Sequence, residues 1–236
     1  MAVNTETVTV KLGMDTYEAY FAAPANGGPR PGIVVLQEIF GVNEHIRAVT
    51  ERLAEAGFAC IAPDMFWRQK RGFTSGYSPE EIAAARELKA QVNNDQLVGD
   101  LRASHQALGN REECDRDRIG VIGFCFGGLM SYLYTARMHP KCAVSYYGGG
   151  IVDYLGDYVK IGCPILFHFG ERDEAIPMSD VEQIKEHAAQ APVDATIHTY
   201  PEAGHGFNCD LRGSYHEPSA NEAWERTLKF FKEHLG

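Results

Sequence analysis

The sequence predicts an α/β fold built on a mostly parallel β-sheet with helices on both faces. From residue 32 to the end, short apolar runs alternate with segments of helical periodicity. Most of these runs are apolar nearly throughout, as in strands that are covered on both faces. No internal repeat and no long linker divides the chain, so we expect one domain spanning residues 1–236.

Six apolar or β-branched runs are the expected strands of the parallel part of the sheet. They are residues 32–37, 58–63, 119–124, 142–147, 164–169 and 195–200. The segments 5–10 and 16–22 precede this alternation, and we expect them to form an antiparallel hairpin at one edge of the sheet.

The expected helices show apolar spacing or N-terminal capping signals. In residues 44–56, Ile46, Val49 and Leu53 recur at intervals of three to four residues, and Gly57 can end the helix. Three further helices are predicted from capping boxes, in which a serine precedes a glutamate by three residues. These boxes start at Ser78, Ser179 and Ser219.

Charge and composition disfavour several classes of partner. The chain has 22 Lys and Arg against 32 Asp and Glu, giving a net charge of -10. We therefore expect no nucleic-acid or anionic-membrane partner, because both would be repelled. The N-terminus "MAVNTETVTV" lacks the basic start and apolar core of a signal peptide, and no apolar run approaches the roughly 20 residues of a membrane span. A cytoplasmic location is expected.

The six cysteines are expected to be free thiols in a reducing compartment. No C-x-x-C or H-E-x-x-H motif is present, so no metal site is predicted.

One cysteine lies in a pattern that predicts chemistry. The stretch "RIGVIGFCFGGLMSYLYTA" is a strand, a sharp turn and a helix, with Cys125 between Gly123 and Gly127. In a nucleophile elbow such a turn holds the central residue in a strained conformation above the sheet. The following helix N-terminus stabilises a thiolate and a developing oxyanion. A buried structural cysteine is the simpler alternative; a dinucleotide site is disfavoured because the glycines do not form G-x-G-x-x-G.

An acid and a histidine follow Cys125 in the order that an elbow nucleophile requires. Asp173 lies in "GERDEAIP" after one predicted strand, and His205 lies in "AGHGFN" after the next. Both lie where the carboxyl ends of parallel strands form a binding crevice. The sequence therefore predicts a Cys125–His205–Asp173 triad.

The segment "QEIFGVNEHIR" follows the buried strand 32–37 and contains Glu38. In elbow-bearing sheets this position supplies the second amide of the oxyanion hole. Glu38 itself could equally be a solvated turn residue or a charge near a helix N-terminus.

These segments, with "APDMFW", "GFCFGG", "GERD" and "AGHGF", resemble the dienelactone hydrolase family, over almost the whole chain from about residue 5. The resemblance implies an α/β-hydrolase fold with eight strands and no lid domain. It implies an ester hydrolase of the carboxymethylenebutenolidase type, with Cys125 as nucleophile, His205 as base and Asp173 orienting it. Glu38 would help to activate the thiol, and the amides of Ile39 and Phe126 would form the oxyanion hole. The resemblance implies no cofactor.

The substrate pocket departs from the family pattern. Characterised members resemble one another in binding the substrate carboxylate with an Arg and, one turn later, a Tyr on a helix, and with an Arg four residues after the histidine. Here these positions hold Ile82, Arg86 and Cys209. Arg86 and Arg212 are the candidates for binding an anionic substrate, with Arg68 as a further possibility.

Thiol chemistry restricts the substrate independently. A free cysteine thiol has a pKa of about 8.5 and is a better leaving group than an alkoxide, so acylation needs an enolate, phenolate or thiolate to leave. The expected substrate is a small-molecule enol-lactone or activated ester; both monomer and dimer are left open. The alternatives are a redox-sensing thiol protein and a catalytically silent binding module on the same fold.

Overall fold

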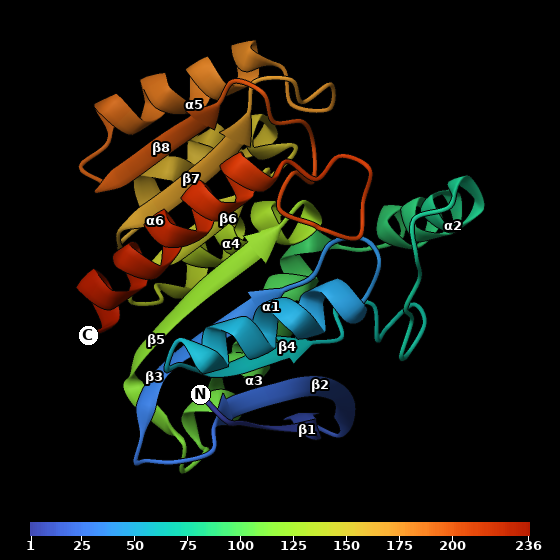
Figure 1. Cartoon of the computed structure of the whole chain (residues 1–236), viewed down its shortest axis with the longest axis vertical. Coiled ribbons are helices and arrows are strands. Elements are labelled where there is room, and N and C mark those ends of the chain that lie inside the picture. The colour runs from blue at the N-terminus through green and yellow to red at the C-terminus, as the bar shows by residue number, and fades with distance from the viewer. The chain divides into compact units, whose positions relative to one another are not determined.

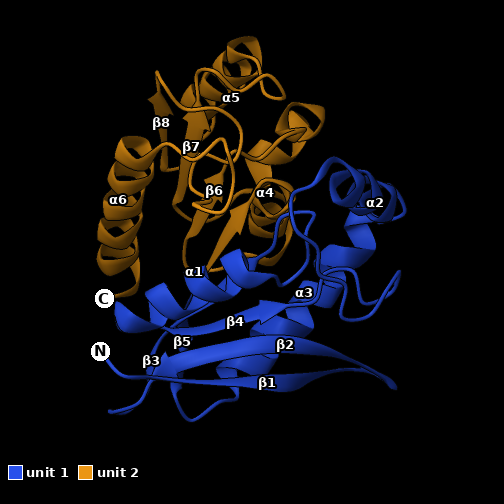
Figure 2. Ribbon diagram, turned by 45° about the vertical axis from the view of Figure 1, so that its right-hand side comes forward, with its two compact units in different colours: residues 1–120 blue, residues 121–236 orange.

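The computed structural model describes all 236 residues and confirms the predicted fold class, α/β with an eight-stranded, mostly parallel sheet. The strand order is β1-β2-β4-β3-β5-β6-β7-β8. The strands are β1 (Val3–Leu12), β2 (Asp15–Pro24), β3 (Arg30–Leu36), β4 (Ala59–Pro63), β5 (Cys114–Phe124), β6 (Ala143–Tyr146), β7 (Ile165–Gly170) and β8 (Ala195–Tyr200). The chain divides into two compact units, Met1–Gly120 and Val121–Gly236 (Figure 2).

The first unit contains the predicted edge hairpin and three helices. Strands β1 and β2 pair antiparallel around the two-residue turn Gly13–Met14, β2 pairs antiparallel with β4, and β3 pairs parallel with β4. The helices are α1 (Glu44–Glu55), α2 (Pro79–Ala90) and α3 (Asn94–Gly109). Helices α1 and α3 cover opposite faces of these strands (Figure 1). Strands β3 and β4 are almost wholly buried, which explains their continuous apolar sequence.

The second unit is a run of parallel strands, in which β6 pairs with β5 and β7, and β7 pairs with β8. Its helices are α4 (Phe126–Met138), the 3-10 helix η1 (Ile151–Lys160), α5 (Met178–Gln190) and α6 (Glu217–Leu235). Helices α4 and α6 lie on opposite faces of the strands (Figure 1). Parallel strands of this kind bring their carboxyl ends to one edge, where loops carry functional residues.

The helix starts were predicted with mixed success. The Ser78 hydroxyl accepts a hydrogen bond from the Glu81 amide and the Glu81 carboxylate accepts one from the Ser78 amide, so α2 begins with the predicted capping box. The boxes predicted at the other two serines are wrong, because each helix begins earlier in the chain. Pro177 is the N-cap of α5, and Ser219 lies within the first turn of α6, where its hydroxyl is 2.8 Å from His216 Nδ1.

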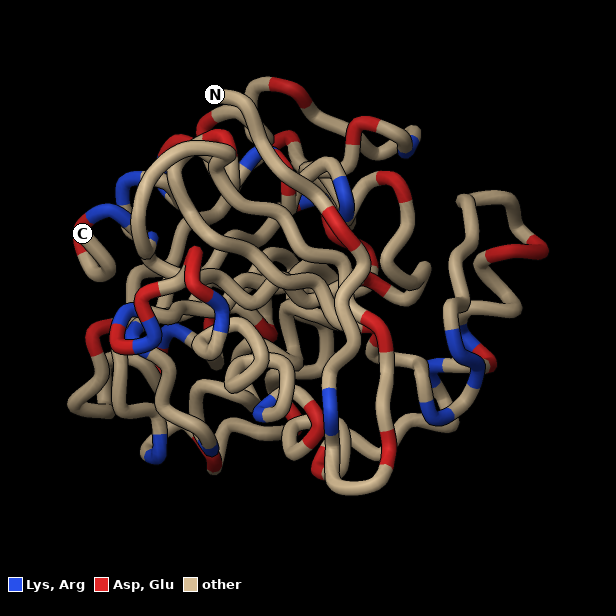
Figure 3. The backbone as a smooth tube through the Cα atoms, turned by 90° about the horizontal axis from the view of Figure 1, so that it is seen from below, with Lys and Arg blue, Asp and Glu red and all other residues tan.

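Acidic and basic residues are interspersed along the chain in the view of Figure 3. No helix combines the length and the apolar character needed to cross a membrane. All six cysteines are free, as predicted, and only Cys125 and Cys163 are partly exposed.

Candidate active site

Cys125 lies at the turn between β5 and α4 with the positive φ that a nucleophile elbow predicts. Its φ and ψ are 53° and -114°, and it is the N-cap residue of α4. Such a conformation costs a non-glycine residue about 1–3 kcal/mol. The Cys125 amide donates to the carbonyl of Tyr146 at 3.0 Å, which fixes the elbow to the end of the neighbouring strand β6. The sulfur is therefore held at the carboxyl edge of the parallel strands.

Glycines make this turn possible because the backbone approaches itself closely there. A Cβ atom on Gly123 would collide with the Gly127 carbonyl, so position 123 accepts no side chain without movement. A Cβ atom on Gly128 would lie 2.5 Å from the Tyr146 oxygen and 2.9 Å from the Gly148 Cα. The helix can thus begin against the end of β6 only because these positions lack side chains.

The loops after β7 and β8 bring Asp173 and His205 together. The Glu171 amide donates to the Tyr200 carbonyl, and the Arg172 amide donates to the Ala203 carbonyl at 2.9 Å. Gly170, at the end of β7, permits this approach, since a Cβ atom there would collide with the Ala203 oxygen. The parallel pairing of β7 and β8 continues through these bonds into the two loops.

His205 lies between Asp173 and Cys125. Its Nδ1 is 2.8 Å from Asp173 Oδ2, and its Nε2 is 3.1 Å from Cys125 Sγ. Asp173 Oδ1 accepts hydrogen bonds from the amides of Ala175 and Ile176 at 2.8 and 3.1 Å. The Asp173 side chain is 1% exposed and that of His205 is 22% exposed. The aspartate is therefore rigidly held, while the imidazole remains reachable from solvent.

Electrostatics at His205 favour its charged form. Burial alone lowers the pKa of an imidazole, but the neighbouring Cys125 sulfur and the hydrogen bonds with Asp173 and Cys125 outweigh burial and raise the pKa of His205 to about 10. A protonated imidazole beside an ionised sulfur is the arrangement that activates cysteine nucleophiles.

Phe126 is the first residue of α4, directly after Cys125. The first amides of a helix have no intrahelical acceptor and lie at its positive end. This is the position that the sequence predicts for one oxyanion-hole donor.

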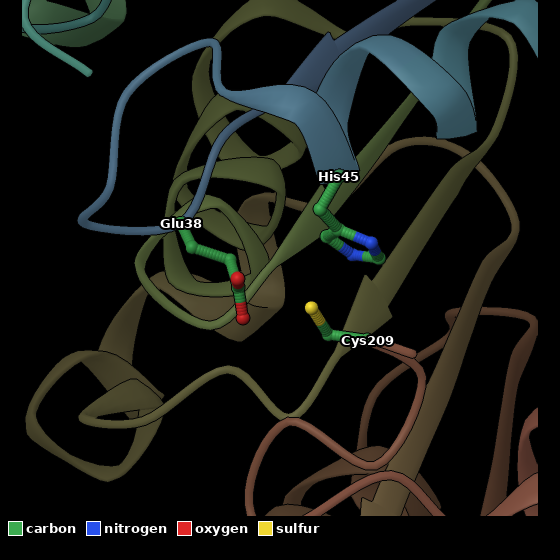
Figure 4. A group of neighbouring side chains, drawn as sticks. All are labelled: Glu38, His45 and Cys209. Atoms are coloured by element: carbon green, nitrogen blue, oxygen red, sulfur yellow. The ribbon is translucent and has the colours of Figure 1, made fainter. Parts of the chain in front are cut away.

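Glu38 and Ile39 follow β3 in the first unit. Glu38 is fully buried, which excludes the solvated turn residue that its sequence context allowed. A Glu38 carboxylate oxygen and a ring nitrogen of His45, in the first turn of α1, lie within 4.8 Å of each other (Figure 4). The preceding Gln37 accepts a hydrogen bond from the Met65 amide at 3.2 Å and so joins this segment to the residues after β4.

The three candidate arginines have different surroundings. Arg212 is half-buried, and its guanidinium lies directly against Gly206, the residue after His205. Arg86 is exposed on α2. Arg68 makes a bidentate ion pair with the buried Asp100, at 2.7 and 2.9 Å, and is therefore committed to a structural contact.

Sequence analysis did not identify Tyr147 as a residue of this region. It follows β6, has a φ of 36°, and its ring centroid lies 5.3 Å from that of His205. The glycines of "YYGGG" signal a turn, but nothing in the pattern indicates that a tyrosine would adopt positive φ.

The matched family and relatives agree with this fold. The model of the dienelactone hydrolase family matches residues 17–235. A protein named "Putative carboxymethylenebutenolidase" from Synechocystis sp. is 38% identical over 245 residues, covering 100% of both chains. A protein of the same name from Escherichia coli K12 is 37% identical and covers 94% of this chain and 84% of its own length.

Solved structures show the same architecture. The crystal structure of a protein named "Putative Dienelactone Hydrolase" from Klebsiella pneumoniae superimposes with a TM-score of 0.90 at 35% identity, covering 98% of this chain and 99% of the other. A dienelactone hydrolase-like promiscuous phosphotriesterase from metagenomic libraries has a TM-score of 0.86 at 24% identity over 100% of both chains, a likeness of fold alone.

The fold is thus that of an α/β protein with a strand–turn–helix elbow at the carboxyl edge of its parallel strands. The chain belongs to the dienelactone hydrolase family, a family of hydrolases that act on small molecules.

Proposed function

We propose that this chain hydrolyses enol-lactones or activated carboxylic esters through a Cys125–His205–Asp173 triad and a thioester acyl-enzyme. The observation that carries the proposal is the position of His205, with one ring nitrogen 2.8 Å from Asp173 and the other 3.1 Å from the Cys125 sulfur. A nucleophile, a base and a group that orients the base are the elements that covalent acyl transfer requires.

In the proposed acylation, the Cys125 thiolate attacks the carbonyl carbon of the substrate. The C–O π electrons move to the oxygen, and the amides of Phe126 and Ile39 donate hydrogen bonds to the resulting oxyanion. The intermediate collapses with cleavage of the C–O bond to the leaving group. His205 donates its Nε2 proton to that group, or releases it to solvent when the group leaves as a stable enolate or phenolate, so that the imidazole is neutral before deacylation. Asp173 keeps the imidazole in the required orientation and tautomer.

Deacylation reverses these roles. Neutral His205 takes a proton from water, and the hydroxide attacks the thioester carbonyl. The second tetrahedral intermediate uses the same amides and expels the Cys125 thiolate, so that one ester bond and one water are consumed per turnover.

In this proposal Glu38 assists formation of the thiolate when substrate binds. Support for this role comes from its complete burial, since glutamate side chains are rarely kept entirely out of water.

The leaving group sets the substrate class. A tetrahedral adduct with a simple alkyl ester expels the thiolate again, because an alkoxide is a far poorer leaving group. Enol-lactones and nitrophenyl esters avoid this reversal. For an anionic lactone we propose Arg212 as the binding cation, because its guanidinium lies next to the residue after His205. Arg86 remains the second candidate.

The test is a burst experiment with 4-nitrophenyl acetate on the wild type and on Cys125→Ala and Cys163→Ala. Cys163 is the matched control because it is the other partly exposed thiol. We expect a stoichiometric burst, an acetyl group on Cys125 by mass spectrometry, and loss of both in Cys125→Ala only. Full turnover by Cys125→Ala would exclude the mechanism. A Cys125 that oxidises reversibly with peroxide but turns over no ester would favour the redox-sensing alternative.

A further inference from the structure

Tyr147 holds a backbone conformation that tyrosine rarely adopts. Only three non-glycine residues of the chain have positive φ: Cys125, His139 and Tyr147, the last at 36°. The residue is completely buried. A strained, non-glycine position persists only where its surroundings determine it, at a cost of about 1–3 kcal/mol, and such positions concentrate at functional sites.

The turn that contains Tyr147 is hydrogen-bonded to the elbow on one side and to β7 on the other. Tyr146 accepts a hydrogen bond from the Cys125 amide at 3.0 Å, and the Tyr147 amide donates to the His168 carbonyl at 2.8 Å. The chain therefore leaves β6 while fixed to the nucleophile on one side and to the neighbouring strand on the other. This double attachment determines where the Tyr147 side chain emerges.

The Tyr147 ring emerges against His205. The two ring centroids are 5.3 Å apart with an interplanar angle of 60°. Phe207 contacts the same tyrosine in a T-shaped arrangement at 5.4 Å, and Phe124 lies at 6.3 Å. Both phenylalanines are fully buried. With its backbone fixed and aromatic neighbours around it, the ring of Tyr147 has no room to move away from the imidazole.

We propose that Tyr147 is a positioning residue of the hydrolase reaction: its strained backbone holds an aromatic ring against His205, which keeps the imidazole between Asp173 and Cys125. This inference rests on the proposed function of that triad. Asp173 and Cys125 contact the two ring nitrogens of His205, but these two contacts alone leave the imidazole free to rotate about the line that joins the two nitrogens. A buried ring packed beside the imidazole restricts that motion, and an aromatic neighbour also favours a cationic partner.

Three variants separate the ring of Tyr147 from its hydroxyl and from core packing in general. Tyr147→Phe keeps the ring, Tyr147→Leu removes it, and Phe167→Leu removes a buried ring elsewhere in the same unit, where Phe167 stacks on Phe169. For each we measure the melting temperature, kcat and KM with 4-nitrophenyl acetate, and the pH dependence of Cys125 alkylation by iodoacetamide.

We expect Tyr147→Leu to lower kcat by about tenfold or more, because small displacements of catalytic groups have effects of this size. Its KM should change far less, and the rate of Cys125 alkylation at neutral pH should fall, because the displaced imidazole no longer adjoins the sulfur. Tyr147→Phe should behave as the wild type. Phe167→Leu should lose stability without a change in the alkylation profile. If Tyr147→Leu does not fold, Tyr147→Met replaces it, since methionine fills the space without a ring.

A folded Tyr147→Leu with wild-type kcat and alkylation profile would overturn the inference. Equal impairment of Tyr147→Phe and Tyr147→Leu would overturn it as well, because the hydroxyl would then be the functional group. Failure of the proposed function is recognised separately, since Cys125→Ala would still turn over ester, whereas the alkylation profile needs no turnover.

Discussion

Asp173 holds His205 with one carboxylate oxygen while two backbone amides hold the other. Oδ2 is 2.8 Å from His205 Nδ1, and Oδ1 accepts from Ala175 and Ile176. The carboxylate is therefore fixed by its own loop before it contacts the imidazole. Any role of Asp173 in orienting His205 can be separated from its role in folding the loop, because each uses a different oxygen.

Asp173→Asn makes this separation experimentally. The asparagine oxygen can still accept from the two loop amides, so we expect the melting temperature to change little. Its NH2 group cannot accept a hydrogen bond from Nδ1–H, so His205 should lose the required tautomer and kcat should fall by about 10²–10⁴. Glu174→Gln, at the exposed neighbouring position, is the control for charge. An Asp173→Asn enzyme with wild-type kcat would show that the aspartate does not orient the base.

Thiol reactivity should differ sharply among the six cysteines. Burial raises the pKa of Cys114 and Cys163 to about 12 and raises that of Cys60 and Cys142 as well. Cys125 is partly exposed and adjoins an imidazole with a raised pKa. We expect substoichiometric iodoacetamide at neutral pH to modify Cys125 first, as measured by peptide mass spectrometry. Preferential labelling of Cys163 would contradict the expectation that the imidazole beside Cys125 makes it the most reactive thiol.

The protonation of His205 should depend on the sulfur beside it. An unperturbed histidine titrates near pH 6.5, whereas His205 has a pKa of about 10. Since the folded value is the higher one, the stability contributed by protonated His205 is complete below about pH 6.5 and is lost as the pH rises through about 10.

Cys125→Ser removes the sulfur, whose charge raises the pKa of His205 more than any other neighbour does, so the titration midpoint of His205 should fall. Nitrogen-15 NMR of the imidazole, over a pH range from about 5 to about 11 that brackets both values, measures this midpoint in the two proteins. Identical titration of His205 in the two proteins would exclude the coupling.

Two glycine-to-alanine substitutions should affect stability in opposite directions. Gly99 lies inside α3, and a Cβ atom there would meet nothing within 4 Å. Gly99→Ala should therefore stabilise the protein by about 0.5–1 kcal/mol, because alanine loses less backbone entropy in a helix. Gly123→Ala should destabilise it, because the new methyl group collides with the Gly127 carbonyl. Urea unfolding of both variants measures the difference, and equal midpoints would refute it.

Arg212 and Arg86 can be ranked by their effect on a charged substrate. A guanidinium that binds a carboxylate makes charge-assisted hydrogen bonds, so its removal should raise KM for a carboxylated ester far more than for 4-nitrophenyl acetate. We expect this for Arg212→Ala, because Arg212 lies against the residue after His205, and not for Arg86→Ala, because Arg86 is exposed on α2. If neither substitution changes the ratio of the two kcat/KM values, the preferred substrate is neutral.

The strands were predicted well from the sequence because parallel strands that are buried on both faces consist of continuous runs of apolar residues. The elbow was predictable from its glycines, since position 123 has no room for a Cβ atom beside the Gly127 carbonyl. The starts of α5 and α6 were not, because a serine three residues before a glutamate forms a capping box only when the serine itself is the N-cap. Pro177 and His216 occupy those positions instead.

The burial of Glu38 and the backbone conformation of Tyr147 could not be predicted from the sequence either. A glutamate next to an apolar run can face water or the interior with the same local pattern. The positive φ of Tyr147 results from tertiary hydrogen bonds at both ends of its turn, and residue types do not record such bonds. Tertiary packing determines both the burial of Glu38 and the backbone conformation of Tyr147, and the local sequence does not.

Gly128 and Gly148 exclude side chains from one another: a Cβ on either would lie within 3 Å of the backbone of its counterpart. A larger residue at one position cannot be accommodated by a smaller residue at the other, because both positions already hold glycine, the smallest residue. In a directed-evolution library aimed at a new ester, random codons at these two sites would mostly yield inactive clones. Arg212 and Leu211 are better sites for random codons, because they lie on the loop after His205 and their side chains reach solvent.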